Sequence, residues 1–243
     1  MRALLTAPLK QDTGIFLAFQ EALDELIIPD GVTLDRYYVV NDCPEVIDLI
    51  QGDYDVCNTG DVYEKTHNDH IWTDENLGKM PLLRNMTIRK ALDGGYDYWW
   101  SVDTDLILDP HTLEQLLAAD KDIVSEVFWT QSKAGGWWCN GWMYDQCDAA
   151  GHLPEWSQPG LYQVGMTGAN TLVKTDCFRA GLSYDPIPNI RKALWGEDRW
   201  FSIRAAVLGI EMWLDTHCPA EHLFTPKIYQ DYIERRRERY ASD

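Results

Sequence analysis

The chain has 243 residues, a formal net charge of −18 and 45% hydrophobic residues. These values suit one large domain, or one core domain with a small elaboration, and a sizeable core. They disfavour a general nucleic-acid-binding protein, which presents a basic face, and no apolar stretch reaches the roughly 18 residues of a transmembrane segment. The six cysteines form no C-x-x-C pair, which predicts reduced thiols rather than disulfides or a zinc site.

The first half of the chain alternates between strand-like and helix-like segments. Residues 2–7 form a short apolar run that predicts a first strand rather than a secretion signal, so we expect a cytoplasmic location. Apolar residues from Phe16 to Leu26 at helical spacing predict a helix that Asp12 or Thr13 caps. Further strands are expected at 33–40, 54–58, 96–102 and 122–129, and helices at 75–92 and around Leu113. This order predicts an α/β fold with a mostly parallel sheet covered by helices on both faces.

The second half has a different pattern. Residues 135–144 predict part of a small antiparallel ribbon, and residues 163–173 predict one strand despite two glycines. Gly196 precedes a predicted helix that Gly209 ends, and residues 210–214 predict the last strand. The tail contains four arginines between residues 235 and 239. It predicts a solvated terminal helix, with a contact to a partner or an anionic surface as the alternative.

Asp103-Thr104-Asp105 follows directly after the aromatic strand predicted at 96–102. The carboxyl end of a strand is the usual ligand-binding edge of an open α/β sheet. Side chains two residues apart on an extended chain point the same way, so both carboxylates can face one hard cation. The alternative is that the two acidic residues serve solubility or cap the next helix.

Several motifs occur in an order that resembles GT-A glycosyltransferases, the nucleotide-diphospho-sugar transferases that include family 2. The resemblance spans roughly residues 2–222 and rests on these segments: Arg84-Asn85 followed by Ala91-Leu92, the D-x-D strand at 96–105, the glycine-containing strand at 168–173, Gly196-Glu197-Asp198, and His222. It implies a Rossmann-like GT-A catalytic domain over residues 1–226, followed by the basic tail at 227–243. Residues 1–130 would form the nucleotide-sugar-binding half and residues 131–226 the acceptor-binding half. The chain departs from the family at Lys174-Thr175-Asp176, where a basic pair is common.

The resemblance implies a metal-dependent hexosyltransferase that uses a UDP- or GDP-sugar. Mn²⁺ or Mg²⁺ on the donor diphosphate would act as a Lewis acid, and it would supply a local cation in an acidic protein. The implied ligands are Asp105 and His222, with Asp103 at the metal or the ribose. His217, just after the predicted last strand, is the alternative histidine.

The resemblance also implies roles for other residues. Asp198, with Glu197 beside it, is the candidate general base of an inverting transferase, because a helix start stabilises negative charge; plain helix capping is the alternative. Pro8, Asp42 and Arg84 are candidate donor contacts, although a structural ion pair is equally compatible with the last two. The tryptophans of the ribbon would either stack on a sugar or pack in the core: Trp137, Trp138 and Trp142.

The acceptor is a hydroxyl compound whose class the sequence leaves open: a glycan, a lipid-linked sugar, a protein side chain or a small molecule. Two other functions are alternatives to sugar transfer. A sugar-phosphate nucleotidyltransferase would carry a glycine-rich basic loop after the first strand, and residues 6–11 do not form one. A carbohydrate-binding protein without catalysis would use the tryptophan-rich ribbon.

Overall fold

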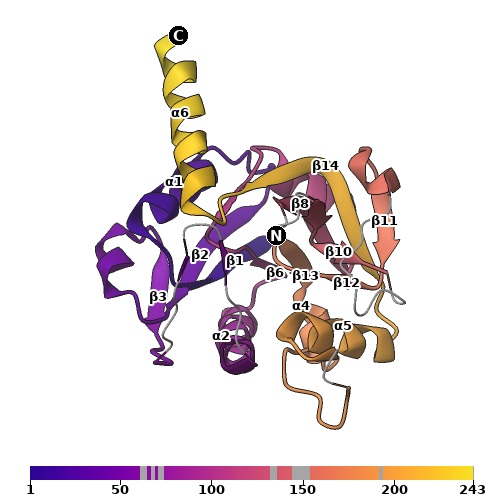
Figure 1. The fold of residues 1–243 in the computed structure, drawn as a ribbon. Coiled ribbons are helices and arrows are strands. Elements are labelled where there is room, and N and C mark those ends of the chain that lie inside the picture. The colour runs from indigo at the N-terminus through magenta and orange to yellow at the C-terminus, as the bar shows by residue number, and fades with distance from the viewer. Residues whose placement is uncertain are drawn as a thin grey trace.

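A computed structural model describes residues 1–60, 65–66, 69–70, 74–131, 136–143, 154–191 and 194–242. Its main element is a ten-stranded sheet with the strand order β11-β14-β8-β13-β6-β1-β2-β3, to which β7 and β9 are joined at β14 and β8 (Figure 1). The strands are β1 (Arg2–Leu9), β2 (Thr33–Val40), β3 (Asp53–Val56), β6 (Tyr98–Ser101), β7 (Leu106–Ile107), β8 (Ile123–Gln131), β9 (Trp137–Cys139), β11 (Leu161–Val164), β13 (Thr171–Lys174) and β14 (Met212–His222).

Two small two-stranded sheets complete the described strands: β10 (Gly141–Trp142) with β12 (Met166–Thr167), and β4 (Lys65–Thr66) with β5 (Asp69–His70). The α-helices are α1 (Thr13–Asp24), α2 (Asp74–Asp93), α3 (Thr112–Ala118), α4 (Thr175–Arg179), α5 (Glu197–Val207) and α6 (Pro226–Ser242). Two 3₁₀ turns are η1 (Pro44–Leu49) and η2 (Pro154–Ser157).

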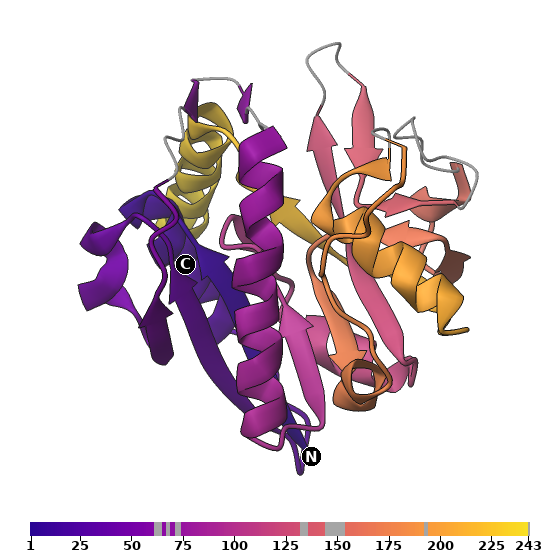
Figure 2. The same ribbon diagram turned by 90° about the horizontal axis from the view of Figure 1, so that it is seen from below.

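The sheet is mixed, and its N-terminal part, β6-β1-β2-β3, is entirely parallel. Helices α2, α4 and α5 lie below the sheet in Figure 1 and α1 lies above it. Seen from below, α2 runs along the N-terminal half while α5 covers the C-terminal half (Figure 2). This arrangement confirms the predicted α/β architecture, with a mostly parallel sheet and helices on both faces.

Alternating side chains of the same strands build a hydrophobic core on each face of the sheet. Leu4 and Trp99 belong to the core under α2, whereas their neighbours Leu5 and Trp100 belong to the core under α1. Each of these four side chains is at most 1% exposed. A parallel strand covered on both faces is largely apolar along its length, which explains the nearly continuous apolar runs in the sequence.

Two predicted strands differ from the structure. The single strand expected at 163–173 is three strands, β11, β12 and β13. Gly165 interrupts the first two, and Asn170 has a left-handed φ of 62° before β13 begins. The strand expected at 210–214 continues as β14 to His222, with a pairing irregularity between Asp215 and Ala220.

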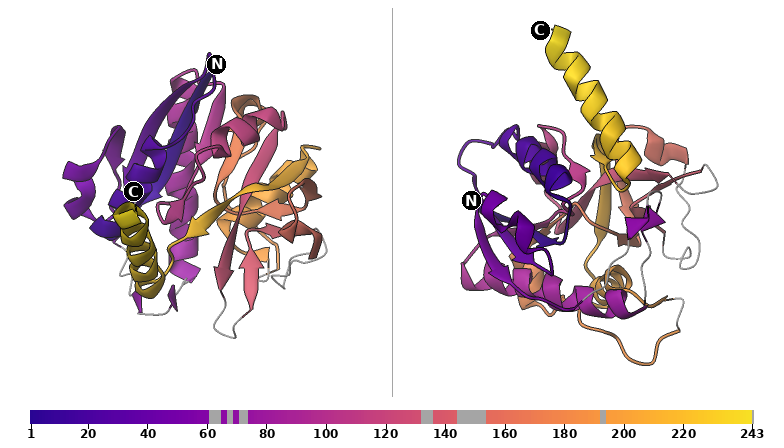
Figure 3. Two further views of the ribbon diagram at one scale, coloured as in Figure 1. Left: turned by 90° about the horizontal axis from the view of Figure 1, so that it is seen from above. Right: turned by 60° about the vertical axis from the view of Figure 1, so that its left-hand side comes forward.

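The C-terminal tail forms helix α6, which extends away from the sheet (Figure 3). Its first turns pack against α1 through Ile228, Tyr229 and Tyr232. Arg236 forms ion pairs with Glu21 and Glu25 of the α1 region, at 2.7 and 3.4 Å. Within the described part of the chain, no helix is both long and apolar enough to cross a membrane.

Candidate active site

The carboxyl ends of β1, β2 and β6 lie at one edge of the sheet, because these strands are parallel neighbours. Pro8 lies near the end of β1, paired in register with Val39. Asp42 follows β2 with a φ of 51°, and its backbone N–H donates to Asn58 Oδ1 at 3.0 Å. Asp103 follows β6 by two residues. The predicted donor contacts therefore end up on one edge, although they come from distant parts of the sequence.

A buried arginine lies beside the first aspartate of the D-x-D motif. Arg84 projects from α2 and is 3% exposed. Its Nη1 donates to Ser101 Oγ at 2.7 Å, and its Nη2 donates to Asp103 Oδ1 at 3.1 Å. Its Nε is buried without a hydrogen-bond partner among the described residues. The guanidinium group of Arg84 therefore provides a positive charge at the carboxyl end of β6, in contact with Asp103.

The second aspartate of the motif lies against His222. The short strand β7 pairs with the end of β14, with Leu106 opposite His222. The backbone N–H of Leu223 donates to the carbonyl oxygen of Asp105 at 2.7 Å. This pairing brings His222 Nε2 to 3.5 Å from Asp105 Oδ2. Strand pairing thus determines which histidine reaches the D-x-D motif.

The donor chemistry of this pair fits a divalent cation. Two adjacent ligands of an octahedral ion, each at about 2.1 Å, lie about 3 Å apart, close to the observed separation. The other ring nitrogen of His222, Nδ1, lies 2.9 Å from Thr130 Oγ1, and such a contact orients a metal-binding imidazole. Across the described ranges, no three His, Cys, Asp or Glu side chains form a ligand group on their own.

The alternative histidine lies in a different cluster. His217 Nδ1 is 2.8 Å from Asp215 Oδ1 and 3.2 Å from Gln115 Nε2. Asp215 is completely buried, and it pairs in register with Glu126 of β8. His222 and His217 were the two alternatives for the histidine beside the D-x-D motif. In the structure His222 lies at the motif, and His217 lies in this separate cluster.

Glu126 is a buried acidic residue of the same cluster. Its Oε1 accepts a hydrogen bond from the backbone N–H of Cys218 at 3.1 Å. Its Oε2 is buried with no hydrogen-bond partner among the described residues. Burial, together with the negative charge of Asp215, raises the pKa of the Glu126 carboxyl to about 9. Glu126 is therefore protonated at neutral pH.

Glu197 and Asp198 begin helix α5, and their charges act on Arg84. Gly196 precedes them with a φ of 132°, a conformation that favours glycine. Burial and the charge of Glu197 raise the pKa of Asp198 well above its ordinary value, while Arg84 opposes this shift. Burial also raises the pKa of Glu197. A carboxyl whose pKa is raised in this way is a stronger base than an exposed aspartate.

These groups line one cavity of about 520 Å³, which lies within the usual range for small-molecule sites. Its lining residues are Arg84, Asp103, Phe128, Thr130, Trp138, Cys139, Asn140, Trp142, Met166, Gly168, Ala169, Trp195, Gly196, Glu197, Asp198 and Arg199. Of the three tryptophans singled out in the ribbon, Trp138 and Trp142 line the cavity, and Trp137 does not. Phe128 and Thr130 also contact His222, so the cavity adjoins the Asp105–His222 pair.

Asn140 is a cavity residue that the sequence did not reveal. Its Nδ2 donates to the carbonyl oxygens of Glu126 and Ala169, at 3.0 and 3.1 Å, and its Oδ1 accepts from Phe128 N–H at 2.9 Å. It therefore joins β8 to the segment that precedes β13. Cys139-Asn140-Gly141 looks like an ordinary turn in sequence, so no local signal marks it. The sequence contained only a weak indication of Thr130: it lies two residues after Phe128 on β8, so the two side chains share one face of the strand.

Comparisons with known proteins identify the family and the fold of the chain. A model of the glycosyltransferase family 25 N-terminal domain matches residues 45–235. The crystal structure of GalNAc-T7 with UDP, GalNAc and Mn²⁺ is similar with a TM-score of 0.58 and 11% identity, over 96% of this chain and 47% of that one. S. aureus TarS 1–349 in complex with UDP gives a TM-score of 0.54 and 11% identity, over 91% of this chain and 60% of that one.

The chain thus spans between about half and three fifths of the length of these two structures. At 11% identity the likeness concerns the fold, which is that of GT-A glycosyltransferases. No curated protein sequence is significantly similar to the chain.

Proposed function

The chain belongs to the family of the glycosyltransferase family 25 N-terminal domain, and we propose that it is a metal-dependent hexosyltransferase. In this proposal it moves a hexose from a UDP- or GDP-sugar to a hydroxyl acceptor, with inversion at the anomeric carbon. UDP is the first donor nucleotide to test, because both GalNAc-T7 and TarS have been crystallised with UDP.

The observation that carries the proposal is the approach of His222 Nε2 to Asp105 Oδ2 at 3.5 Å, beside the Arg84–Asp103 ion pair. An imidazole and a carboxylate suit Mn²⁺, and a carboxylate suits Mg²⁺. The metal would neutralise charge on the leaving diphosphate. Arg84 supplies a second, permanent positive charge to the same wall of the cavity.

Asp198 is the proposed general base. It lines the same cavity as Arg84 and Asp103, at the start of α5. A base there would take the proton of the acceptor hydroxyl as the sugar is transferred. The resemblance to GT-A transferases, together with a carboxyl that can act as a base in the cavity, is the reason for favouring inversion. Pro8 and Asp42 are proposed to contact the nucleoside at the ends of β1 and β2.

The test measures thermal unfolding with UDP or GDP, each with and without Mn²⁺. A ligand that binds only the folded state at a hundred times its dissociation constant stabilises it by about 2.7 kcal/mol. We expect His222→Ala to lose most of the metal-dependent shift. The matched control, His217→Ala, removes a histidine of the same strand outside the cavity and should retain that shift. Equal loss in both variants, or a shift that does not need metal, would contradict the proposed site.

Product analysis then tests the reaction itself. A glycosyltransferase releases a nucleoside diphosphate from its donor. Release of pyrophosphate from a nucleoside triphosphate and a sugar phosphate would identify a nucleotidyltransferase instead.

A further inference from the structure

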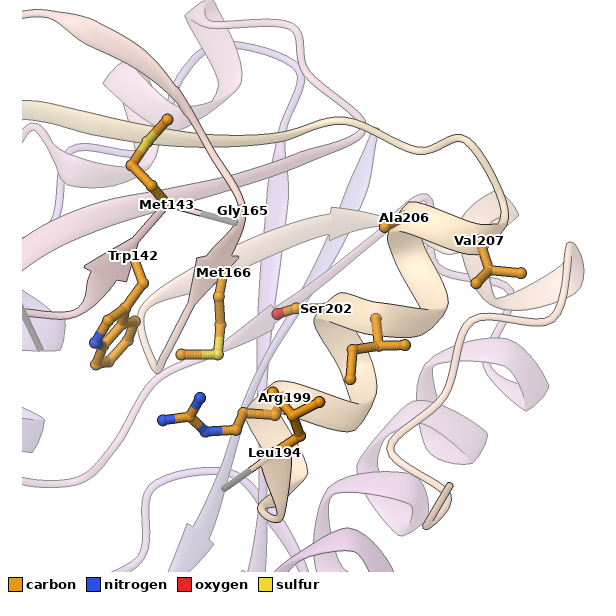
Figure 4. Close-up of a pocket in the computed structure, with 10 residues that line it drawn as sticks. Trp142, Met143, Gly165, Met166, Leu194, Arg199, Ser202, Ala206 and Val207 are labelled. Atoms are coloured by element: carbon orange, nitrogen blue, oxygen red, sulfur yellow. The ribbon is translucent and has the colours of Figure 1, made fainter. Parts of the chain in front are cut away.

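A second hollow, of about 330 Å³, opens beside the catalytic cavity, and its wall is largely apolar. Its lining residues are Trp142, Met143, Gly165, Met166, Leu194, Arg199, Ser202, Ile203, Ala206 and Val207. Figure 4 shows Trp142 and Met166 on one side of the hollow and helix α5 on the other, with the Arg199 side chain extending from α5 towards them. Among these described residues, Arg199 alone carries a charge. The hydroxyl of Ser202 donates to the carbonyl oxygen of Asp198 at 2.7 Å, within α5.

The two cavities are neighbours with a shared wall. Trp142, Met166 and Arg199 line both of them. Asp198 lies in the catalytic cavity, and α5 continues from it into the apolar hollow. At a rise of about 1.5 Å per residue, Ser202 to Val207 lie about 6 to 14 Å along the helix axis from Asp198. A molecule that reacts at Asp198 and extends by one ring along α5 therefore reaches the apolar wall.

We propose that the apolar hollow binds a compact aromatic group of the acceptor, next to the hydroxyl that receives the sugar. This inference rests on the proposed function, because it takes Asp198 as the place where the acceptor reacts. The volume lies at the lower end of the range for small-molecule pockets, so the hollow fits one ring system rather than a whole lipid chain. Its largely apolar lining offers few partners for the hydroxyl groups of a second sugar and favours an apolar group instead.

The test compares pairs of acceptor analogues that differ only in the apolar group. The probes are the 2-naphthyl and methyl β-glycosides of glucose, galactose and N-acetylglucosamine, with binding followed by saturation-transfer NMR and titration. In at least one pair the naphthyl glycoside should bind at least about tenfold more tightly, which corresponds to about 1.4 kcal/mol. Equal binding within every pair would overturn the inference.

Two variants locate the site. Ala206 is exposed and lines the hollow, so Ala206→Phe fills it without disturbing the core. Leu208 directly follows the last residue of α5, is 39% exposed and is not among the lining residues, so Leu208→Phe is the matched control. The preference for the naphthyl group should disappear in Ala206→Phe and persist in Leu208→Phe. A preference that survives Ala206→Phe would overturn the assignment to this hollow.

The failure of this inference can be told apart from the failure of the proposed function. Metal-dependent binding of UDP or GDP does not depend on the acceptor. If the donor binds and sugar is transferred with no preference for apolar acceptors, the acceptor inference alone is wrong. If no donor binds, both the proposed function and the acceptor role of the hollow are wrong.

Discussion

Replacing Glu126 by glutamine is expected to stabilise the protein at neutral and alkaline pH. Glu126 is fully buried, and its partner across the strand pair, Asp215, is fully buried as well. Two carboxylates that both ionise there would repel each other in a medium of low dielectric constant. A glutamine keeps the oxygen that accepts from Cys218 N–H, and it carries no charge at any pH.

The sign and size follow from the pKa of Glu126. It is about 9 in the folded protein, against an ordinary value of 4.5. The folded state therefore holds a proton that the unfolded chain releases above about pH 4.5. The free energy of unfolding therefore falls as the pH rises from about 4.5 to about 9, by up to about 1.4 kcal/mol per pH unit. At pH 7.5 the buried carboxyl lowers the free energy of unfolding by on the order of 2–4 kcal/mol. The glutamine variant should be more stable than the wild type by this amount.

The assay is urea unfolding followed by tryptophan fluorescence at pH 5 and pH 8. The variant should exceed the wild type in free energy of unfolding by far more at pH 8 than at pH 5. Glu211→Gln is the control, because Glu211 is exposed just before β14 and should show no such difference. An effect of Glu126→Gln that is the same at both pH values would refute the argument, since it would mean that Glu126 does not hold its proton.

Three further predictions concern the proposed catalytic cavity. Asp198→Asn should reduce transfer by roughly 10²–10⁴-fold and leave metal-dependent nucleotide binding intact. In the wild type, kcat/KM should fall with decreasing pH as Asp198 gains a proton, at a pH above the ordinary aspartate range. Arg84→Met should move this acid limb to higher pH, because Arg84 lowers the pKa of Asp198. Asn140→Ala should lower the free energy of unfolding by roughly 1–3 kcal/mol, since it leaves Phe128 N–H and two carbonyl groups without their partner.

Each of these has an outcome that would contradict it. Loss of nucleotide binding in Asp198→Asn would mean that this carboxylate belongs to the donor site. An unchanged acid limb in Arg84→Met would mean that Arg84 does not affect the pKa of Asp198, the proposed general base. A thermal unfolding temperature of Asn140→Ala equal to that of the wild type would show that water replaces its hydrogen bonds.

The sequence predicted the features that depend on local patterns. The aromatic strand that ends at the D-x-D motif and the helix that carries Arg84 are where the patterns placed them. Gly95, with a φ of 66°, ends that helix as expected. Local patterns carry such features because burial on both faces and helix termination are properties of a few consecutive residues.

Features that depend on pairing between distant segments were not predictable. Nothing near His217 or His222 reveals that β14 continues past Asp215, or that its end pairs with β7. The break at Asn170 likewise reflects a backbone conformation that the strand-like composition of residues 163–173 conceals. The position of Asn140 depends on three hydrogen bonds to segments that the sequence gives no reason to bring together.

The pairing of β7 with β14 has a consequence for the order in which the protein becomes active during synthesis. Asp105 leaves the ribosome early, whereas His222 and the strand that positions it are made much later. Until then the D-x-D motif has no imidazole beside it. A nascent chain that ends before β14 should therefore be unable to assemble the proposed metal site, which ties the capacity for sugar transfer to a chain whose sheet is complete.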